Sequence, residues 1–298
     1  QGESICGWKQ RCVLPLVPPA SKSAVPVVWH QSNTKVVVLV GTKHGKIYRF
    51  DSQDGGGEFE YIESAFSDLQ FDGRAAPVCA KASGSANTCD HLIVGTASGA
   101  MFKVDIHDTS APSSTTYRAL QVKHLSGALE DLIVGSGNAF PAVVDDDTKN
   151  GVLNENDMFV GSNDGKILFF RATTNDTVYD KGEEVEAIHF ADNGVSLALH
   201  KYKGVTYLLA GRHARLDAEE QRWRKPAKNE GTTDAFRWYK VVSEEVDGAS
   251  TIRLQKVVVE NIDGLSAFDA QLEDLKVQDH SDTISADPVA VSFLQNDD

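Results

Sequence analysis

The loop between Asp145 and Asp157 carries a dense set of oxygen-bearing side chains. A hard cation such as Ca²⁺ takes oxygen ligands from alternate loop positions, with a glycine at the sharp turn and a carboxylate near the end. Gly151 occupies that turn. The expected ligands are Asp146, Thr148, Asn150, the carbonyl of Val152, Asn154 and Asp157. The sequence therefore predicts a weak calcium site, and the alternative is a solvated acidic turn without an ion.

Catalytic constellations are scarce in the sequence. It contains no Gly-x-Ser-x-Gly, His-Glu-x-x-His or Cys-x-x-Cys motif and no phosphate-binding glycine loop. The nine histidines are scattered along the chain, and the acidic runs are typical of solvated surfaces. We therefore expect a non-enzymatic protein. A hydrolase with paired carboxylates at a central channel is the alternative.

Four cysteines form two close pairs in the sequence, Cys6 with Cys12 and Cys79 with Cys89. An even count at short spacing predicts two local disulfides and an oxidising compartment, whereas free thiols in a cytosolic protein are the alternative. The sequon at Asn175 predicts N-glycosylation and agrees with a secreted or lumenal location. A Cys79–Cys89 bond would pin the bend that an ion would pin in the Asp145–Asp157 loop.

These residues belong to a pattern that repeats along the chain. Each copy begins with an apolar opening strand and a loop. A strand ending in Val-Gly-Thr or a variant of it comes next, followed by a glycine turn and a further apolar strand. The copies are Ala24–Asp51, Ala75–Asp105, Phe140–Arg171 and Val195–Leu216, and Ala286–Phe293 restarts the opening strand. The openings at Pro26, Pro77, Pro141, Ser196 and Pro288 lie 51, 64, 55 and 92 residues apart. Such repeats predict an all-β propeller of about five blades, within a range of roughly four to seven.

The glycines and apolar runs of each copy indicate how its strands are arranged. Pairs such as Gly161 and Gly165 are expected to supply the positive φ angles of tight hairpins. Continuous apolar runs such as Val36–Val40 predict strands buried on both faces. The candidates for a fourth strand in the first three copies are Glu60–Phe66, Tyr117–Val122 and Val185–Phe190.

The whole chain, residues 1–298, is predicted to form one domain. The orphan opening strand near the C-terminus suggests a ring closed by the termini, with Ser4–Leu16 completing a blade; a chain cut from a longer polypeptide is the alternative. Residues 217–234 are interpreted as a charged surface insertion, and residues 261–287 as an irregular acidic segment. Arg222, Trp223 and Arg224 on the insertion have side-chain types common in binding hot spots, although an ordinary charged loop has the same composition.

The third copy resembles the FG-GAP or VCBS-type repeat of integrin-like propellers, in which an Asp-rich loop precedes a strand ending in Val-Gly. The family's loop pattern falls on Asp146, Thr148, Asn150, Gly151 and Asn154, with Asp157 just before Met158–Gly161. In the first two copies the acidic loop is missing or reduced to its last Asp. The resemblance implies an extracellular propeller with loops that bind calcium.

Composition limits the classes of partner. The formal net charge of −14 argues against nucleic acid, whose phosphates require clustered Lys and Arg. No apolar run is long enough to span a bilayer. The sequence thus predicts a binding or scaffold module of an extracytoplasmic assembly with a protein partner. A glycan-binding lectin is the alternative, but Trp29, Trp223 and Trp238 occupy non-equivalent places in the copies.

Overall fold

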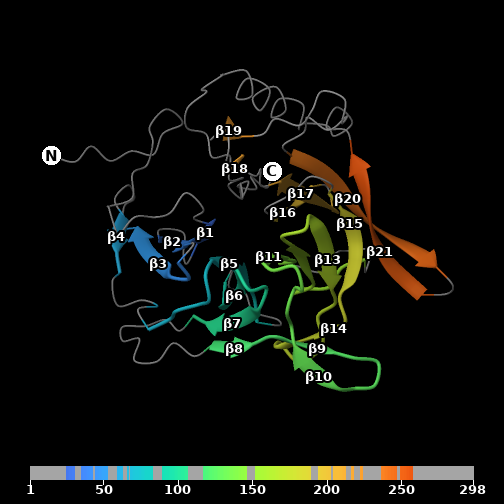
Figure 1. The fold of residues 1–298 in the computed structure, drawn as a ribbon, viewed down its shortest axis with the longest axis horizontal. Helices are drawn as coiled ribbons and strands as arrows, with labels where there is room; N and C mark the ends of the chain where they lie inside the picture. Colours follow the sequence, from blue (N-terminus) through green and yellow to red (C-terminus); the bar gives the residue numbers. More distant parts are fainter. Residues whose placement is uncertain are drawn as a thin grey trace.

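The computed structural model describes an all-β protein (Figure 1). Its described residues are 25–30, 35–42, 44–52, 59–62, 66, 68–82, 89–106, 117–145, 152–188, 194–202, 204–212, 216–217, 222–223, 236–246 and 249–257. Every regular element in these ranges is a β-strand. The described residues include no helix with the length and apolar character needed to cross a membrane.

Sixteen strands form four antiparallel sheets of four strands each. The first sheet contains β1 (Val25–His30), β2 (Val36–Gly41), β3 (Ile47–Ser52) and β4 (Phe59–Tyr61). The second contains β5 (Ala75–Ala80), β6 (His91–Thr96), β7 (Met101–Asp105) and β8 (Tyr117–Ala119). The third contains β11 (Phe140–Val143), β12 (Met158–Gly161), β13 (Lys166–Phe170) and β15 (Glu183–Ala187). The fourth contains β16 (Val195–Tyr202), β17 (Val205–Arg212), β20 (Phe236–Val246) and β21 (Ala249–Val257).

Two small sheets complete the described strands. The accessory sheet has the order β10-β9-β14 and consists of β9 (Gln121–Lys123), β10 (Leu129–Asp131) and β14 (Val178–Asp180). A two-residue pair joins β18 (Leu216–Asp217) to β19 (Arg222–Trp223). The predicted fourth strands overlap the observed ones only in part: Glu60–Phe66 overlaps β4 at two residues and Val185–Phe190 overlaps β15 at three. The segment Tyr117–Val122 contains β8 and then, after Leu120, the start of β9.

The same hairpin turn joins the second and third strands of the first three sheets. In the third sheet, Ser162 N donates to Lys166 O at 3.0 Å, and Gly165 N donates to Ser162 O at 3.2 Å. The Ser162 hydroxyl also accepts a hydrogen bond from Lys166 N at 3.1 Å. Thr42 and Thr96 hold the equivalent turns through the same backbone bonds. The threonine or serine in each of these three sheets therefore stabilises the hairpin turn through hydrogen bonds within the turn itself.

The two glycines of each copy have different roles, which corrects part of the expectation from sequence. Gly45 and Gly165 have positive φ angles, as predicted. Gly41 and Gly161 do not; instead each lies against the opening strand of the next sheet. A Cβ on Gly161 would stand 1.8 Å from the carbonyl oxygen of Val195, and a Cβ on Gly41 would stand 2.1 Å from that of Ala75. The requirement at these positions is close backbone approach between sheets.

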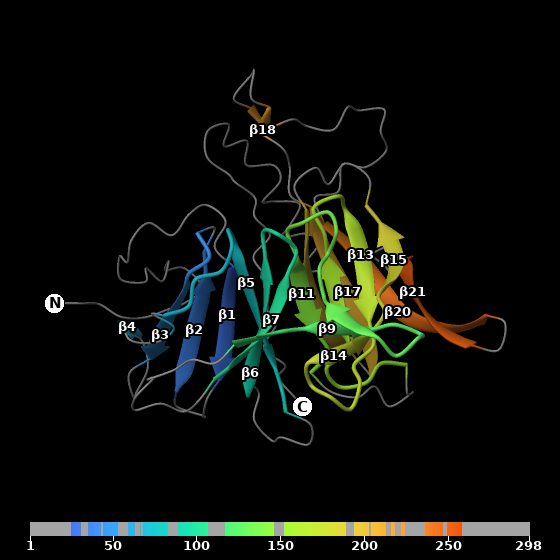
Figure 2. The ribbon, with the colours of Figure 1, turned by 60° about the horizontal axis from the view of Figure 1, so that its bottom comes forward.

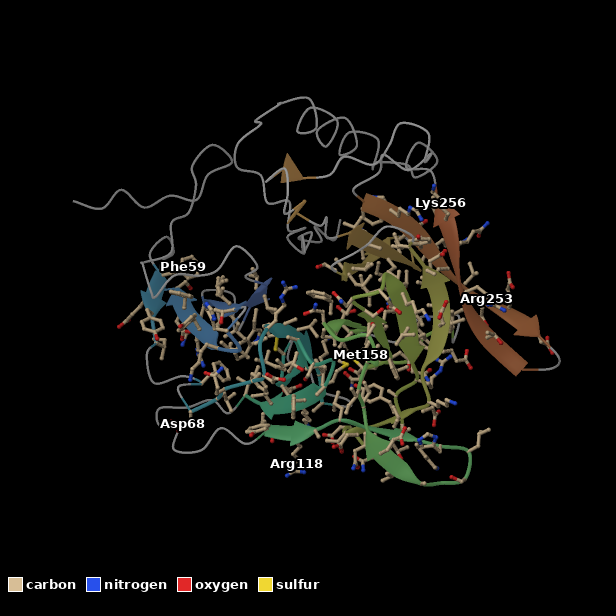
Figure 3. The ribbon with its side chains drawn as sticks, viewed as in Figure 1. Phe59, Asp68, Arg118, Met158, Arg253 and Lys256 are labelled. Atoms are coloured by element: carbon tan, nitrogen blue, oxygen red, sulfur yellow. A yellow bond between two sulfur atoms is a disulfide. The ribbon has the colours of Figure 1, made fainter. Side chains whose placement is uncertain are left out.

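The opening strands accordingly lie next to one another (Figure 1). β5 contacts β1 and β11, and β11 also contacts β16. The later strands of each sheet lie further out in the view of Figure 1. Met158 on β12 lies in the interior of this arrangement, whereas Arg118 on β8 projects from its outer edge (Figure 3).

Three apolar clusters fill the spaces between successive sheets. Val37 and Leu92 belong to the cluster between the first and second sheets, and Phe159 and Leu208 to the cluster between the third and fourth. The cluster between the second and third sheets also includes Leu132 and Tyr179, from the region of the accessory sheet. All six residues of β6 are buried. This confirms a strand covered on both faces for β6, whereas Val36 and Val38 in the run Val36–Val40 are only half-buried.

Candidate functional site

The predicted calcium loop is only partly described. Asp146, Thr148 and Asn150 lie outside the described residues, whereas Val152, Asn154 and Asp157 lie within them. Asp157 is fully buried just before β12. One of its carboxylate oxygens accepts hydrogen bonds from Asn154 N at 2.8 Å and Arg171 Nη1 at 2.7 Å, and the other accepts from Ala172 N at 2.9 Å.

These contacts give Asp157 a structural role at the end of the loop. Burial raises the pKa of its carboxyl group, and the hydrogen bonds and the Arg171 charge oppose that rise. A guanidinium nitrogen of Arg171 lies 2.7 Å from the same oxygen, so this carboxylate has a protein cation as its partner. Arg171 also donates to the carbonyl of Val152 at 3.2 Å. The calcium prediction for Asp146, Thr148, Asn150, Val152, Asn154 and Asp157 stays a prediction.

The bend of the second sheet is held covalently. Cys79 and Cys89 form a disulfide with a Cα–Cα distance of 5.1 Å, as the sequence predicted. Asn156 Nδ2 donates to the carbonyl of Lys81 at 2.9 Å, so the end of the third sheet's acidic loop is tied to this bend. Cys6 and Cys12 lie outside the described residues.

The predicted glycosylation site lies on the turn before β14. Asn175 is exposed, and its side-chain oxygen accepts hydrogen bonds from Thr177 N at 3.1 Å and Thr177 Oγ1 at 2.9 Å. Asp176 pairs with Lys103 of β7, which ties this turn to the second sheet. The sequon is therefore accessible, and glycosylation of Asn175 stays a prediction.

The predicted interaction residues on the insertion are described only in part. Arg222 and Trp223 form β19, and nothing is described of their side chains; Arg224 lies outside the described residues. The proposed hot spot on residues 217–234 stays a prediction.

Catalytic arrangements are not apparent in the described part of the chain. The described residues contain no group of three or more His, Cys, Asp or Glu placed to hold a metal ion. A hollow of about 220 Å³ lies between β17, β20 and Leu153, and Lys240 is the only charged residue in its described lining. His91 is buried, and burial together with the Lys103 charge lowers its pKa to about 4. None of these features brings an acid and a base together at an open site.

The accessory sheet is a surface that the sequence analysis missed. It is built from two excursions, one following β8 and one between β13 and β15, so that strands from the second and third copies share one small sheet (Figures 1 and 2). β9 pairs with β10 in antiparallel fashion and with β14 in parallel. Its inner residues Val122 and Tyr179 are buried against the main core.

The outer side of the accessory sheet exposes apolar side chains. The exposed fractions are 107% for Leu125, 50% for Leu129 and 59% for Ile133. The turn of the hairpin is closed by His124 N donating to Ala128 O at 2.9 Å, with Gly127 at a φ of 84°. Every residue from Leu125 to Asp131 is exposed, so this hairpin projects from the body of the protein.

The hairpin also carries charge. Glu130 and Asp131 are exposed on β10, and Lys123 is exposed on β9 opposite Leu129. His124 Nε2 lies 2.8 Å from Glu130 Oε1. The sequence does contain one indication of this hairpin. The run LSGALEDLI, residues 125–133, is a turn flanked by apolar residues and matches no position of the repeated pattern.

No protein-family model matches the chain. A search of curated proteins finds no similar protein. The resemblance of the third copy to FG-GAP or VCBS repeats therefore rests on its own residues.

Proposed function

We propose that this chain is a non-enzymatic β-propeller that binds a protein partner in an extracytoplasmic assembly. About five blades with a ring closed by the termini would complete the fold. The four similar sheets, their adjacent opening strands and the recurring glycine contacts between sheets support this architecture. The Cys79–Cys89 disulfide supports an oxidising compartment.

The observation that carries the binding function is the accessory sheet. Its projecting hairpin places Leu125 and Leu129 in solvent, and Ile133 just after β10 is exposed as well, whereas all six residues of β6 in the second sheet are buried. Exposed apolar side chains with charged neighbours occur at protein interaction sites.

Affinity capture from the native source tests this proposal. The parent chain, a Leu125→Ser/Leu129→Ser double variant and a Val28→Ser control are immobilised and compared. Val28 is a suitable control because it is 46% exposed and lies on β1, outside the accessory sheet. We expect one protein to be retained in a fixed ratio by the parent and the control, and to be lost from the double variant.

Two results would count against the proposal. Equal retention by all three proteins would place the binding surface elsewhere, and absence of any stoichiometric partner would remove the binding function. Circular dichroism of the double variant should match the parent, because both changed side chains are exposed and contribute little to the core.

A further inference from the structure

We infer that the β10 edge of the accessory sheet binds a partner by strand addition, and that the added strand carries a basic residue between two apolar residues. This inference rests on the proposed function and specifies the chemistry of the partner at the same site. It depends on three features of the hairpin: an open backbone edge, alternating outer side chains and one acidic group between two apolar ones.

The backbone edge follows from the pairing of β9 with β10. In an antiparallel ladder, hydrogen-bonded and non-hydrogen-bonded pairs alternate. Ala128 O accepts from His124 N, and Leu132 N donates to Leu120 O at 2.7 Å, so the even-numbered residues face β9. The N–H and C=O groups of Leu129 and Asp131 therefore point away from β9, where the described accessory sheet has no further strand. An extended peptide can pair with such an edge.

The side chains on the outer face define the sequence of that peptide. Successive residues of an extended chain alternate between faces, so Leu129 and Asp131 of β10 share one face with Ile133, which follows β10 and forms an isolated bridge with Ala100. All three are exposed. An antiparallel strand placed alongside would set its own alternate residues opposite these three, and the residue opposite Asp131 would exchange backbone hydrogen bonds with it. Directly opposed side chains of opposite charge, or of apolar type, stabilise a sheet. The complementary pattern is therefore apolar-x-basic-x-apolar.

A second copy of this chain fits the edge poorly. An antiparallel pair of β10 edges centred on Glu130 would set Asp131 against Leu129, and a pair centred on Asp131 would set two aspartates opposite each other. Each chain carries a net charge of −14, so two copies repel, whereas a basic segment is attracted. The net negative charge of the chain and the negative charge of Asp131 on the edge thus both favour a basic segment as the added strand.

Peptide binding to the full-length chain tests the inference. The probe is the synthetic peptide acetyl-Ser-Val-Thr-Lys-Thr-Val-Ser-amide, and its matched control replaces Lys by Glu. We expect the parent to bind the Lys peptide at least tenfold more tightly than the Glu peptide at low salt, measured by isothermal titration calorimetry. The Asp131→Lys variant should reverse this preference, because the central charge pair is then restored only with Glu.

Backbone methylation distinguishes strand addition from simple charge attraction. An N-methyl group on the central Lys removes a hydrogen bond to the β10 edge and should abolish binding. The same group on a neighbouring Thr points away from the edge and should leave the affinity within about threefold. Equal effects of the two methyl groups would overturn strand addition.

The inference and the proposed function can fail separately. If the native partner is lost from the Leu125→Ser/Leu129→Ser variant but the parent binds neither peptide, or binds both equally, strand addition by a basic segment is wrong and the binding surface stands. If no native partner is retained at that surface, the proposed function itself is wrong. Self-association of the parent through β10, seen by sedimentation and abolished by Asp131→Lys, would identify a second copy as the occupant and overturn the inference.

Discussion

His91 shows how a single buried residue can set the acid sensitivity of this fold. Its pKa is lowered to about 4, first by burial and then by the Lys103 charge, while Asp176, Asp105 and Asp90 oppose the shift. In the folded protein the imidazole stays neutral, whereas in the unfolded chain it takes up a proton below about pH 6.5. The free energy of unfolding should therefore fall as the pH decreases from 6.5 to 4.

The size of that fall can be measured with a His91→Phe variant. One proton taken up on unfolding corresponds to about 1.4 kcal/mol per pH unit, or about 3 kcal/mol over the whole interval. Urea unfolding should give a pH dependence that is flatter by this amount in the variant. Between pH 7 and 9 the two curves should run parallel, because His91 is neutral in both states. Parallel curves down to pH 4 would contradict the burial argument.

Asp157 shows that a loop sequence alone does not identify the binding partner of a carboxylate. Its position at the end of an acidic loop made it a predicted calcium ligand, yet its carboxylate accepts hydrogen bonds from Asn154, Arg171 and Ala172. Two of these donors come from the segment after β13, which the loop sequence does not reveal. A carboxylate in a loop is equally suited to a cation or to N–H donors, and the tertiary surroundings decide between them.

At the scale of elements, the disulfide and the acidic loop occupy equivalent bends of successive sheets. Replacing both Cys79 and Cys89 by alanine should lower the free energy of unfolding by about 3 kcal/mol, because the unfolded chain regains the entropy of a loop with a sequence separation of 10. Urea unfolding without reductant measures the change. An unchanged midpoint and slope would mean that the bend holds its shape without the bond.

The main strands were predictable, but the accessory sheet was not. Lys166–Phe170 forms β13, the further apolar strand predicted after the glycine turn of the third copy, because an apolar run and a glycine turn are local signals. By contrast, β14 is three residues long and pairs in parallel with β9, more than fifty residues earlier in the chain. A short strand in a long-range parallel pair leaves no periodic pattern, so only the folded chain reveals it.

At the scale of the whole molecule, the approach of successive sheets depends on glycine. In Gly161→Ala, the new methyl group would stand 1.8 Å from the carbonyl oxygen of Val195, a backbone atom that cannot rotate away. We expect a loss of about 3 kcal/mol in the free energy of unfolding, because the third and fourth sheets must separate. Thermal and urea unfolding of the purified variant measure the loss.

Gly135→Ala is the matched control for this substitution. A Cβ at Gly135 would have no atom within 4 Å, and the residue lacks the positive φ that would strain an alanine. Its stability should stay within about 0.5 kcal/mol of the parent. If Gly161→Ala were equally well tolerated, the sheets would be held by side-chain packing alone and close backbone approach would not be required.

Sequence alone determined the class of this protein and its repeating unit. Strand-length apolar runs, a recurrent Val-Gly-Thr turn and the Cys79–Cys89 spacing are local patterns, and local hydrogen bonding and burial fix their structure. Only the tertiary structure decided the surroundings of particular residues. Gly161 lies against the backbone of Val195, Asp157 accepts a hydrogen bond from Arg171, and Leu129 is exposed on an edge strand. Each of these depends on a neighbour distant in sequence, because the packing of sheets and the exposure of an edge are properties of the assembled chain.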